Sequence, residues 1–305
     1  MNRGRAARIF RGIAQPMRRA HPVELAERIE LNGGLDRPVR ALSEAVREAL
    51  PRGPLKNLLH GVPVGHPVHA PLTDLPIGAW SSAAVLDLLP GTEKASRVLI
   101  AAGLAGAVPT ALTGIADWSA LHREQQRVGL IHAIGTGTAS ILYAASLLAR
   151  VRGHHLTGKA LGFTGLTALF AGGYLGGHLA FRQAAGANHA ESIAHLVPLG
   201  WHDLCQMEDL PNGWPVHHTL GYIDLFVLRL DDDVRVLADR CAHLAGPLHQ
   251  GRMVRVDDDV CVVCPWHGST FRVADGSVVD GPATGRQPAF DTRVLENGTV
   301  QVRPI

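Results

Sequence analysis

The chain has 305 residues, long enough for two domains, and its 29 Lys and Arg nearly balance its 27 Asp and Glu. Lys and Arg outnumber Asp and Glu by 12 to 6 over residues 1–60 and by 8 to 5 over residues 61–189, whereas Asp and Glu lead by 16 to 9 over residues 190–305. The acidic C-terminal part argues against nucleic acid as a partner, and four cysteines are too few for a disulfide scaffold, which favours metal or redox chemistry.

Residues 1–60 form a basic N-terminal extension with a predicted amphipathic helix. The first residues are rich in arginine but lack the apolar run and cleavage site of a signal peptide, so we expect no cleavage. From Asp36, the expected N-cap, Val39, Leu42 and Val46 recur at helical spacing opposite charged residues. The helix lies either on its own protein or on a membrane surface.

Residues 61–189 predict a four-helix transmembrane domain. About 20 helical residues cross the hydrocarbon core of a bilayer, and soluble bundles seldom leave stretches of this length without a charged face. The four apolar stretches lie at residues 70–89, 98–116, 128–149 and 160–181. Small residues four apart, Gly172 with Gly176 and Gly103 with Ala107, predict places where helix backbones come close together.

Ionisable residues within or just beside these stretches form a candidate intramembrane site. If the spans alternate in direction, one side of the membrane holds seven of them: His66, His69, Asp74, Asp117, His122, His132 and His178. The candidate site comprises His69, Asp74, Asp117, His132 and His178. His132 and His178 lie about one turn inside their spans, at a similar depth, so they could ligate haem b or a metal ion. The alternatives are a quinone-binding or proton-relay pocket, and a structural role in which the histidines cap helices, bond backbone carbonyls or pair with Asp74 and Asp117.

Basic residues near the spans, Arg150 among them, are equally divided between the two sides, so the arginine-rich head decides the orientation. It places the N-terminus in the cytoplasm, and an even number of spans then places the C-terminal domain there too. We expect a multi-pass protein of the cell (inner) membrane with its C-terminal domain in the cytoplasm.

Residues 196–305 predict a compact all-β domain. Short runs rich in branched and aromatic residues alternate with turn residues, and Asn297 with Gly298 indicates a hairpin. The runs lie at residues 214–221, 223–230, 234–239, 260–263, 292–295 and 299–302. The predicted fold class is multi-domain, with an N-terminal all-α four-helix transmembrane bundle followed by an all-β domain.

Two segments of this domain carry cysteine and histidine in pairs. Cys241 and His243 are two residues apart, and Cys264 and His267 are three apart, each pair beside Gly and Pro. Zinc would accept these four ligands, but its structural sites usually pair two cysteines in one segment. One sulfur and one nitrogen per segment suit a [2Fe-2S] cluster with both cysteines on one iron. Cys261 is interpreted as a buried apolar residue and not as a ligand.

These segments resemble the Rieske [2Fe-2S] family. C-A-H-L-A-G-P-L from Cys241 and C-P-W-H-G-S-T-F from Cys264 are similar to its two cluster-binding boxes, and residues 281–283 resemble its proline-containing covering loop. The resemblance spans residues 196–305. It implies that Cys241 and Cys264 bind one iron while His243 and His267 bind the other, with the imidazoles near the surface. The boxes are further apart than in most members, which predicts a longer hairpin at residues 255–259.

The resemblance also implies how the surroundings tune the cluster. Ser269 stands where the family places a hydroxyl donor to a cluster sulfide, and Pro282 belongs to the covering loop. Phe271 replaces the tyrosine of high-potential members, while Gly246 and Trp266 replace the disulfide cysteines of quinol-oxidising complexes. Fewer donors predict a low, ferredoxin-like potential.

Residues 60–185 resemble an uncharacterised four-helix bacterial membrane family. The resemblance rests on a His-Pro-x-His box at residues 66–69, Leu-Pro-Ile-Gly at residues 75–78 and Thr-Gly-Ile-Ala-Asp-Trp at residues 113–118. It implies a fold more than an activity.

The combined patterns predict a membrane-anchored Rieske-type protein that carries single electrons between a redox partner and an unidentified acceptor. Ring-hydroxylating members have a large iron-containing domain after the cluster, which the segment up to Ile305 is too short to hold. We therefore expect an electron-transfer component of an oxidoreductase system, with the lipid bilayer and a reductase or oxygenase as partners. The alternatives are a membrane redox sensor and a haem- or quinone-linked oxidoreductase subunit that uses the intramembrane histidines.

Overall fold

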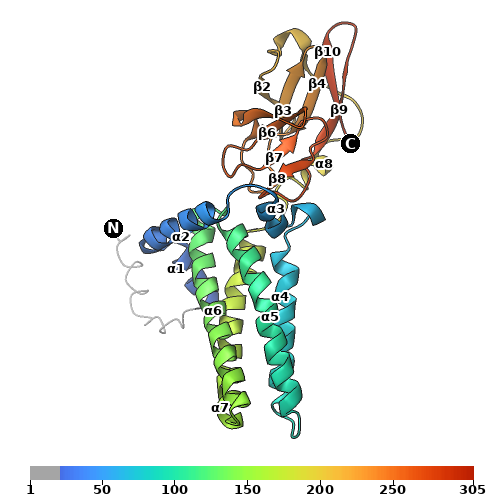
Figure 1. Ribbon diagram of the computed structural model, residues 1–305. Helices are drawn as coiled ribbons and strands as arrows, with labels where there is room; N and C mark the ends of the chain where they lie inside the picture. The colour runs from blue at the N-terminus through green and yellow to red at the C-terminus, as the bar shows by residue number, and fades with distance from the viewer. Residues whose placement is uncertain (1–20) are drawn as a thin grey trace, which may run out of the picture.

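The structure, a computed structural model, describes residues 21–305, so the arginine-rich segment 1–20 lies outside the described residues. A bundle of long helices stands end to end with a β domain, and the short helices α2 and α3 lie at the junction (Figure 1). The helices are α1 (Pro22–Glu30), α2 (Asp36–Ala49), α3 (Pro54–His60), α4 (His69–Leu86), α5 (Glu93–Trp118), α6 (Arg123–Val151), α7 (His155–Gly177) with a π-helical turn at His178–Arg182, and α8 (Ile193–Leu196).

Helix α2 is the amphipathic helix that the sequence predicts, and it packs on its own protein. Val39 and Ser43 are fully buried beneath it, against α5 and α6, while the charged residues face outward. The prediction that Asp36 is the N-cap of this helix is wrong, because Leu35 holds the N-cap position and Asp36 is the first helical residue. The Asp36 carboxylate accepts instead from Arg127 Nε of α6 at 2.7 Å, which fastens α2 to the bundle.

The bundle is built from the long helices α4, α5, α6 and α7. Helices α4 and α5 form one antiparallel pair and α6 and α7 form the other, and the two pairs lie side by side (Figure 1). By length and composition alone, two helices among residues 21–305 are long and apolar enough to cross a membrane, namely α5 and α6. The structure thus shows a helical region followed by an all-β domain.

Aromatic and small residues fill the middle of the bundle. Trp80 of α4 stacks on Tyr143 of α6 with ring centroids 4.2 Å apart. A Cβ atom at Gly103 would lie 2.2 Å from the indole nitrogen of Trp80, so this glycine makes room for a side chain and not for a backbone. The predicted close approach of backbones occurs at Gly172, whose Cα lies 3.1 Å from the Cβ position of Gly135.

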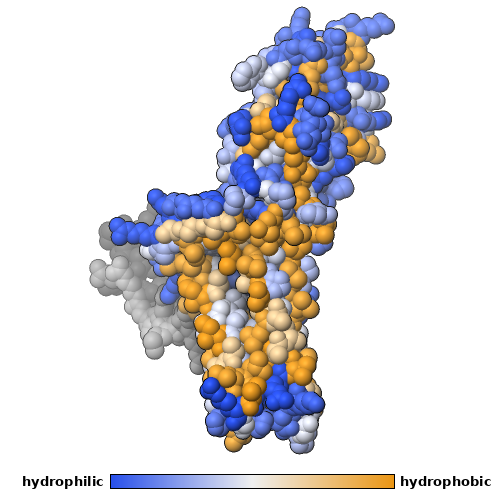
Figure 2. Space-filling model, viewed as in Figure 1, coloured by the Kyte–Doolittle hydropathy of each residue, from blue (hydrophilic) through white to orange (hydrophobic). Residues whose placement is uncertain are grey.

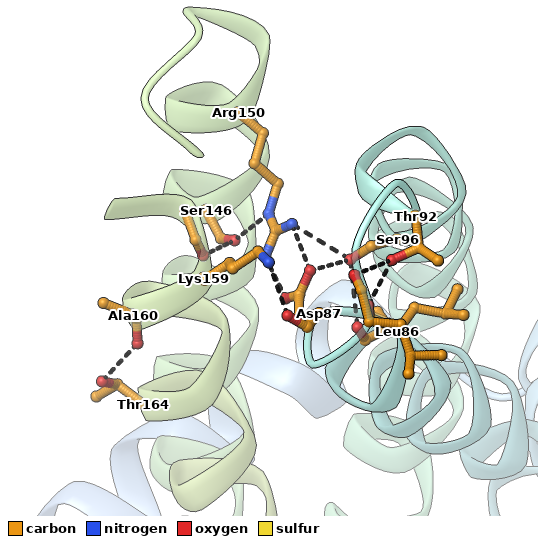
Figure 3. Close-up of polar contacts among 12 residues, drawn as sticks. Leu86, Asp87, Thr92, Ser96, Ser146, Arg150, Lys159, Ala160 and Thr164 are labelled. Atoms are coloured by element: carbon orange, nitrogen blue, oxygen red, sulfur yellow. Dashed lines mark hydrogen bonds and ion pairs between the residues drawn. The ribbon is translucent and has the colours of Figure 1, made fainter. Parts of the chain in front are cut away.

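The end of the bundle remote from the β domain is joined by buried charges (Figure 3). Arg150 of α6 donates to both carboxylate oxygens of Asp87 at the end of α4, at 2.8 and 2.5 Å. Ser96 of α5 donates to the same carboxylate at 2.8 Å, and Lys159 of α7 donates to the Asp87 carbonyl at 2.7 Å. Arg150 is therefore a buried tie between α4, α5 and its own helix α6, and Lys159 adds α7 to the cluster.

The β domain consists of two antiparallel sheets. Six strands are ordered β1-β10-β9-β4-β3-β2 and four are ordered β5-β6-β7-β8. The strands are β1 (His202–Gln206), β2 (Pro215–Leu220), β3 (Ile223–Leu230), β4 (Asp233–Ala238), β5 (Arg252–Val256), β6 (Asp259–Val263), β7 (Thr270–Arg272), β8 (Val278–Asp280), β9 (Ala289–Val294) and β10 (Thr299–Pro304). Their inward residues make one core, to which the cysteines of the two boxes also belong.

The sequence predicts six of these strands and misses β1, β5, β7 and β8, which are three to five residues long. The longer hairpin between the boxes is confirmed as β5 and β6. Asp257 and Asp258 form its turn with φ of 48° and 70°, the left-handed pair that a two-residue hairpin turn requires.

Candidate metal centre

Two loops of the β domain share one backbone design. The first joins β4 to β5 and begins with Cys241, and the second joins β6 to β7 and begins with Cys264. In each loop the cysteine N–H donates to the carbonyl five residues later, at 2.9 and 2.8 Å, and the N–H four residues later donates to the cysteine carbonyl, at 2.8 and 3.0 Å. That fourth residue has a left-handed backbone, with φ of 62° at Ala245 and 82° at Gly268. The repeated geometry presents the two cysteines in equivalent ways.

The two thiols face each other in a buried position. Cys241 and Cys264 are 0% and 3% exposed, and their side chains are hydrogen-bonded. This hydrogen bond, together with the N–H groups of Trp266, His267 and Gly268, lowers the pKa of the Cys264 thiol to about 7. The same pairing and burial raise the pKa of Cys241. Because backbone N–H groups point at the Cys264 sulfur, the second loop favours thiolate there, the form that binds metal.

The two histidines of the boxes form a second pair. The rings of His243 and His267 have centroids 5.0 Å apart and stand nearly perpendicular, at 83°. Burial lowers the pKa of His243 well below its usual value, and burial helped by the neighbouring His122 and Arg47 lowers the pKa of His267 to about 4. Both imidazoles are therefore neutral at pH 7, as metal ligation requires. His243 Nδ1 is buried without a hydrogen-bond partner among residues 21–305.

This donor set suits a two-iron cluster better than a single ion. A thiol pair beside an imidazole pair matches a cluster with two sulfur ligands on one iron and two nitrogen ligands on the other. The partnerless nitrogen of His243 is the group that such a cluster would satisfy.

The predicted surroundings of the centre lie beside it. Ser269 is fully buried, and its Oγ accepts from Ala283 N at 2.9 Å, which leaves its hydroxyl hydrogen available. Phe271 is fully buried and brings no hydroxyl. A Cβ atom at Gly246 would lie 2.8 Å from Cys264 Sγ, so a side chain there would displace the thiol. Pro282 lines a cavity together with His267.

Gln287, which the sequence analysis missed, holds the first loop. It is fully buried, and its Nε2 donates to the carbonyls of Ala238 and Arg240, each at 2.7 Å. Its Oε1 accepts from Ala242 N at 2.9 Å. Gln287 lies 45 residues from Ala242 in sequence and belongs to no motif, so no local signal could have found it.

The imidazole pair faces the helical region, which the sequence did not predict. The ring of His122, at the start of α6, lies 5.1 Å from that of His267 and 5.3 Å from Trp266. Arg52 Nη2, between α2 and α3, lies 3.5 Å from the His267 carbonyl oxygen. The edge of the centre expected near the surface is thus half-covered by the protein's own helices.

Two histidines of the predicted intramembrane site bond backbone carbonyls, one of the alternatives considered for them. His69 Nδ1 lies 2.9 Å from the Thr110 carbonyl oxygen and His132 Nδ1 lies 2.8 Å from that of Gly172. Each bond joins two helices. The rings of His132 and His69 are neighbours, with centroids 6.5 Å apart.

The other residues of that predicted site lie apart. Asp117 pairs with His60 of α3, whose Nδ1 is 2.7 Å from the carboxylate, although His60 was not among the predicted residues. Asp74 is exposed on the bundle surface. His178 Nε2 lies 3.5 Å from Glu30 of α1. The contacts of these side chains connect helices.

The fold and the centre together define a class: a small two-sheet redox domain attached to a helical domain. Residues 200–291 match the family model described as "Rieske [2Fe-2S] domain", and residues 65–189 match "Predicted membrane protein (DUF2231)". The chain is a fusion of a DUF2231 domain with a C-terminal Rieske domain, which implies a [2Fe-2S] cluster. Neither family description mentions haem or a quinone.

Similar proteins match the chain over short stretches. Human apoptosis-inducing factor 3 is 29% identical over 100 residues, 33% of this chain, and the match spans only 16% of that protein. The human Rieske domain-containing protein is 32% identical over 62 residues, 20% of this chain and 40% of that protein. The ferredoxin of carbazole 1,9a-dioxygenase from Nocardioides aromaticivorans IC177 is 23% identical, with a TM-score of 0.31, and covers 34% of this chain and 98% of the ferredoxin.

Proposed function

We propose that the chain is a membrane-anchored Rieske protein that carries single electrons between a redox partner and an acceptor. The observation that supports this most is the pairing of donors: two buried thiols side by side and two neutral imidazoles side by side, one of them with a partnerless buried nitrogen. A [2Fe-2S] cluster in this position supplies reversible one-electron chemistry.

In this proposal Cys241 and Cys264 ligate one iron, and His243 and His267 ligate the other. The backbone N–H groups that point at the sulfurs disperse negative charge, and Ser269 donates its free hydroxyl hydrogen toward the same centre. Burial of Phe271, which lacks a hydroxyl, keeps the number of such donors small. A small number of donors supports a low, ferredoxin-like potential.

The surface of the bundle supports a membrane anchor of four spans. Each long helix exposes large apolar side chains, for example Leu75 at 56%, Val108 at 61%, Ile141 at 71% and Phe170 at 58%. The bundle surface is apolar along most of its length, with hydrophilic residues at its far end and near the junction (Figure 2). A bilayer would cover this surface, which water would otherwise contact at a high free-energy cost. A core helix of a soluble protein is mostly buried, whereas α5 and α6 are 22% buried over their most apolar windows.

The proposed location is the cell (inner) membrane, with the Rieske domain on the cytoplasmic side. The arginine-rich head favours this orientation. The expected partners are a reductase that delivers electrons and an oxygenase or other protein that receives them. The acidic β domain argues against nucleic acid.

Spectroscopy of the full chain in detergent tests this proposal. We expect the absorption and the paramagnetic-resonance signal of a reduced cluster with mixed nitrogen and sulfur ligation, and two irons per chain by metal analysis. Cys264→Ser should abolish the signal. Cys261→Ala is the matched control, because Cys261 is equally buried but donates only to the Asp259 carbonyl, and it should keep the signal. Loss of iron in both variants, or in neither, would contradict the ligand assignment.

A membrane redox sensor is the second candidate, and the contact between His122 and His267 favours it. A change of charge at the cluster would be felt directly at the start of α6. A sensor should change its helical arrangement on reduction, which spin labels on α2 and on the Rieske domain would detect. A carrier should show equal label distances in both states.

A further inference from the structure

A cavity of about 280 Å³ lies where the helical region meets the candidate metal centre. One wall comes from α2, α3 and the residues after α5, and the other from the second loop and the segment around Pro282. Asn57 of α3 joins the two walls, because its Oδ1 accepts from Gly281 N at 2.9 Å and its Nδ2 donates to the Val279 carbonyl at 3.4 Å. Direct contacts between the domains therefore shape the cavity.

The cavity is lined by more positive than negative charge. Three of its residues are cations, Arg47, Arg52 and Lys56, and one is an acid, Asp280. Within residues 21–305 none of the three cations has an ion pair, although Arg47 and Arg52 each donate to a carbonyl. Burial, with repulsion from the two arginines, lowers the pKa of Lys56. An anion in the cavity would relieve this repulsion.

The cavity is also lined by a buried histidine, one ring nitrogen of which is unpaired within residues 21–305. His60 is 1% exposed and lines the cavity, and its Nδ1 lies 2.7 Å from the Asp117 carboxylate. The carboxylate accepts the Nδ1 hydrogen, so Nε2 is left as an acceptor. Nε2 is buried and has no hydrogen-bond partner among the described residues. An unsatisfied buried nitrogen destabilises a fold unless a ligand or water donates to it.

We propose that this cavity binds a phosphate group that carries a hydroxyl. The negative oxygens face Arg47, Arg52 and Lys56, and the hydroxyl donates to His60 Nε2. A simple carboxylate ligand satisfies the cations but brings no hydrogen for the histidine. The volume approaches that of small-molecule sites, so a phosphate monoester has room for part of its organic group.

The affinity of the cavity for phosphate should depend on the redox state of the cluster, an inference that rests on the proposed function. Both His267 and Trp266 line the cavity, so a bound phosphate lies beside one of the imidazole ligands. Reduction adds negative charge to the centre and weakens binding of an anion next to it. By linkage, phosphate lowers the reduction potential by the same free energy, and a tenfold weaker affinity of the reduced protein corresponds to about 59 mV.

Calorimetric titration of the full chain in detergent with inorganic phosphate tests the site. We expect phosphate to bind and sulfate, which has no hydrogen at neutral pH, to bind at least tenfold more weakly. Lys56→Gln should weaken phosphate binding at least tenfold. Lys94→Gln, an exposed lysine at the start of α5, is the matched control and should bind like the parent. Equal binding of sulfate, or equal affinity in the two lysine variants, overturns the proposal.

The phosphate group can come from solution or from a lipid headgroup, because α2 and α3 lie at the expected membrane surface. Chains reconstituted in phosphatidylcholine nanodiscs, with and without phosphatidic acid, separate the two sources. If the source is lipid, phosphatidic acid raises the unfolding temperature of Lys94→Gln but not of Lys56→Gln, and free phosphate has little effect. If neither phosphate nor phosphatidic acid acts on the parent chain, the proposal is overturned.

The two proposals fail separately. Phosphate binding without a paramagnetic-resonance signal would remove the proposed electron carrier and leave the site. A normal cluster signal in a chain that binds neither phosphate nor phosphatidic acid, with a potential that neither one shifts, would remove the site and leave the carrier.

Discussion

In the helical bundle, several buried polar groups satisfy one another, although His60 Nε2 at the junction has no partner among the described residues. Arg150 and Asp87 neutralise each other at the end of the bundle, and His69 and His132 place Nδ1 against backbone carbonyls of neighbouring helices. In the β domain, by contrast, two thiols and two imidazoles at the ends of the two loops face one another, and the Nδ1 of His243 has no hydrogen-bond partner within residues 21–305.

This difference separates residues that hold the fold from residues that bind a ligand. A buried donor that meets an acceptor contributes little net free energy but is costly to break, because its partner is left unsatisfied. A buried nitrogen or thiolate without such a partner is tolerated only where something else completes it. The same residue type, histidine, therefore has different roles: His69 and His132 bond backbone carbonyls between helices, whereas His60 and His243 each keep a buried nitrogen without a partner in the part of the chain that the structure describes.

The largest expected effect on stability comes from the buried ion pair of the helical bundle. Arg150→Met leaves the Asp87 carboxylate buried without its partner, so the free energy of unfolding should fall by about 3–5 kcal/mol. Thermal unfolding in detergent, followed by circular dichroism at the helical band, measures it. The double variant Arg150→Met with Asp87→Leu should recover much of the loss, since no charge is then left unpaired. Additive losses would contradict the reading of this pair as a structural tie.

The next effect addresses the support of the first loop. Gln287→Leu removes three buried hydrogen bonds and leaves two carbonyls and one N–H unsatisfied, so the β domain should lose about 3 kcal/mol. Urea unfolding followed by visible absorption would show a lower midpoint and faster loss of the cluster. Gln250→Leu, at an exposed position in the same domain, should change stability by less than about 0.5 kcal/mol.

The stability of the iron-free protein should depend on pH because of the imidazole pair. In the iron-free protein, folding lowers the pKa of His267 from 6.5 to about 4. Between these two pH values the unfolded chain therefore binds a proton at this residue more readily than the folded chain does. Stability is therefore full above pH 6.5 and is lost as the pH falls toward 4. Because the ring keeps contact with solvent, we expect a loss of about 1–2 kcal/mol.

Urea midpoints of the iron-free chain at several pH values measure this dependence. His267→Gln should make the curve less steep over this interval, and His243, whose pKa is also lowered, should account for part of the slope that remains. His195→Gln, which changes an exposed histidine, should leave it unchanged. An unaltered slope in His267→Gln would show that another group is responsible.

The smallest expected effect tests the equivalence of the two loops. Ala245 has a left-handed backbone, which glycine adopts without strain, so Ala245→Gly should stabilise the domain by about 0.5–1 kcal/mol. The reverse change in the other loop, Gly268→Ala, should destabilise it, because the Cβ would overlap Arg52. Thermal unfolding of the two variants under the same conditions gives the comparison, and a shift of the same sign in both would contradict it.

Much of the fold was readable from the sequence because its signals are local. Apolar stretches located the long helices, and alternating branched residues located the longer strands, such as β3 at its observed bounds. Strands β7 and β8 were missed because three residues carry too little pattern. The N-cap assignment at Asp36 failed because Arg127, distant in sequence, competes for the same carboxylate.

The sequence by itself determined the donor set of the candidate centre, because the spacing of cysteine and histidine within each box is a local property of the chain. Only the tertiary structure decided which buried groups have partners. It joined Arg150 to Asp87, placed Gln287 beneath the first loop, and set His60 and His122 against the Rieske domain. These contacts join residues dozens to hundreds of positions apart, and hydrogen bonding and burial between such residues depend on the packing of whole domains.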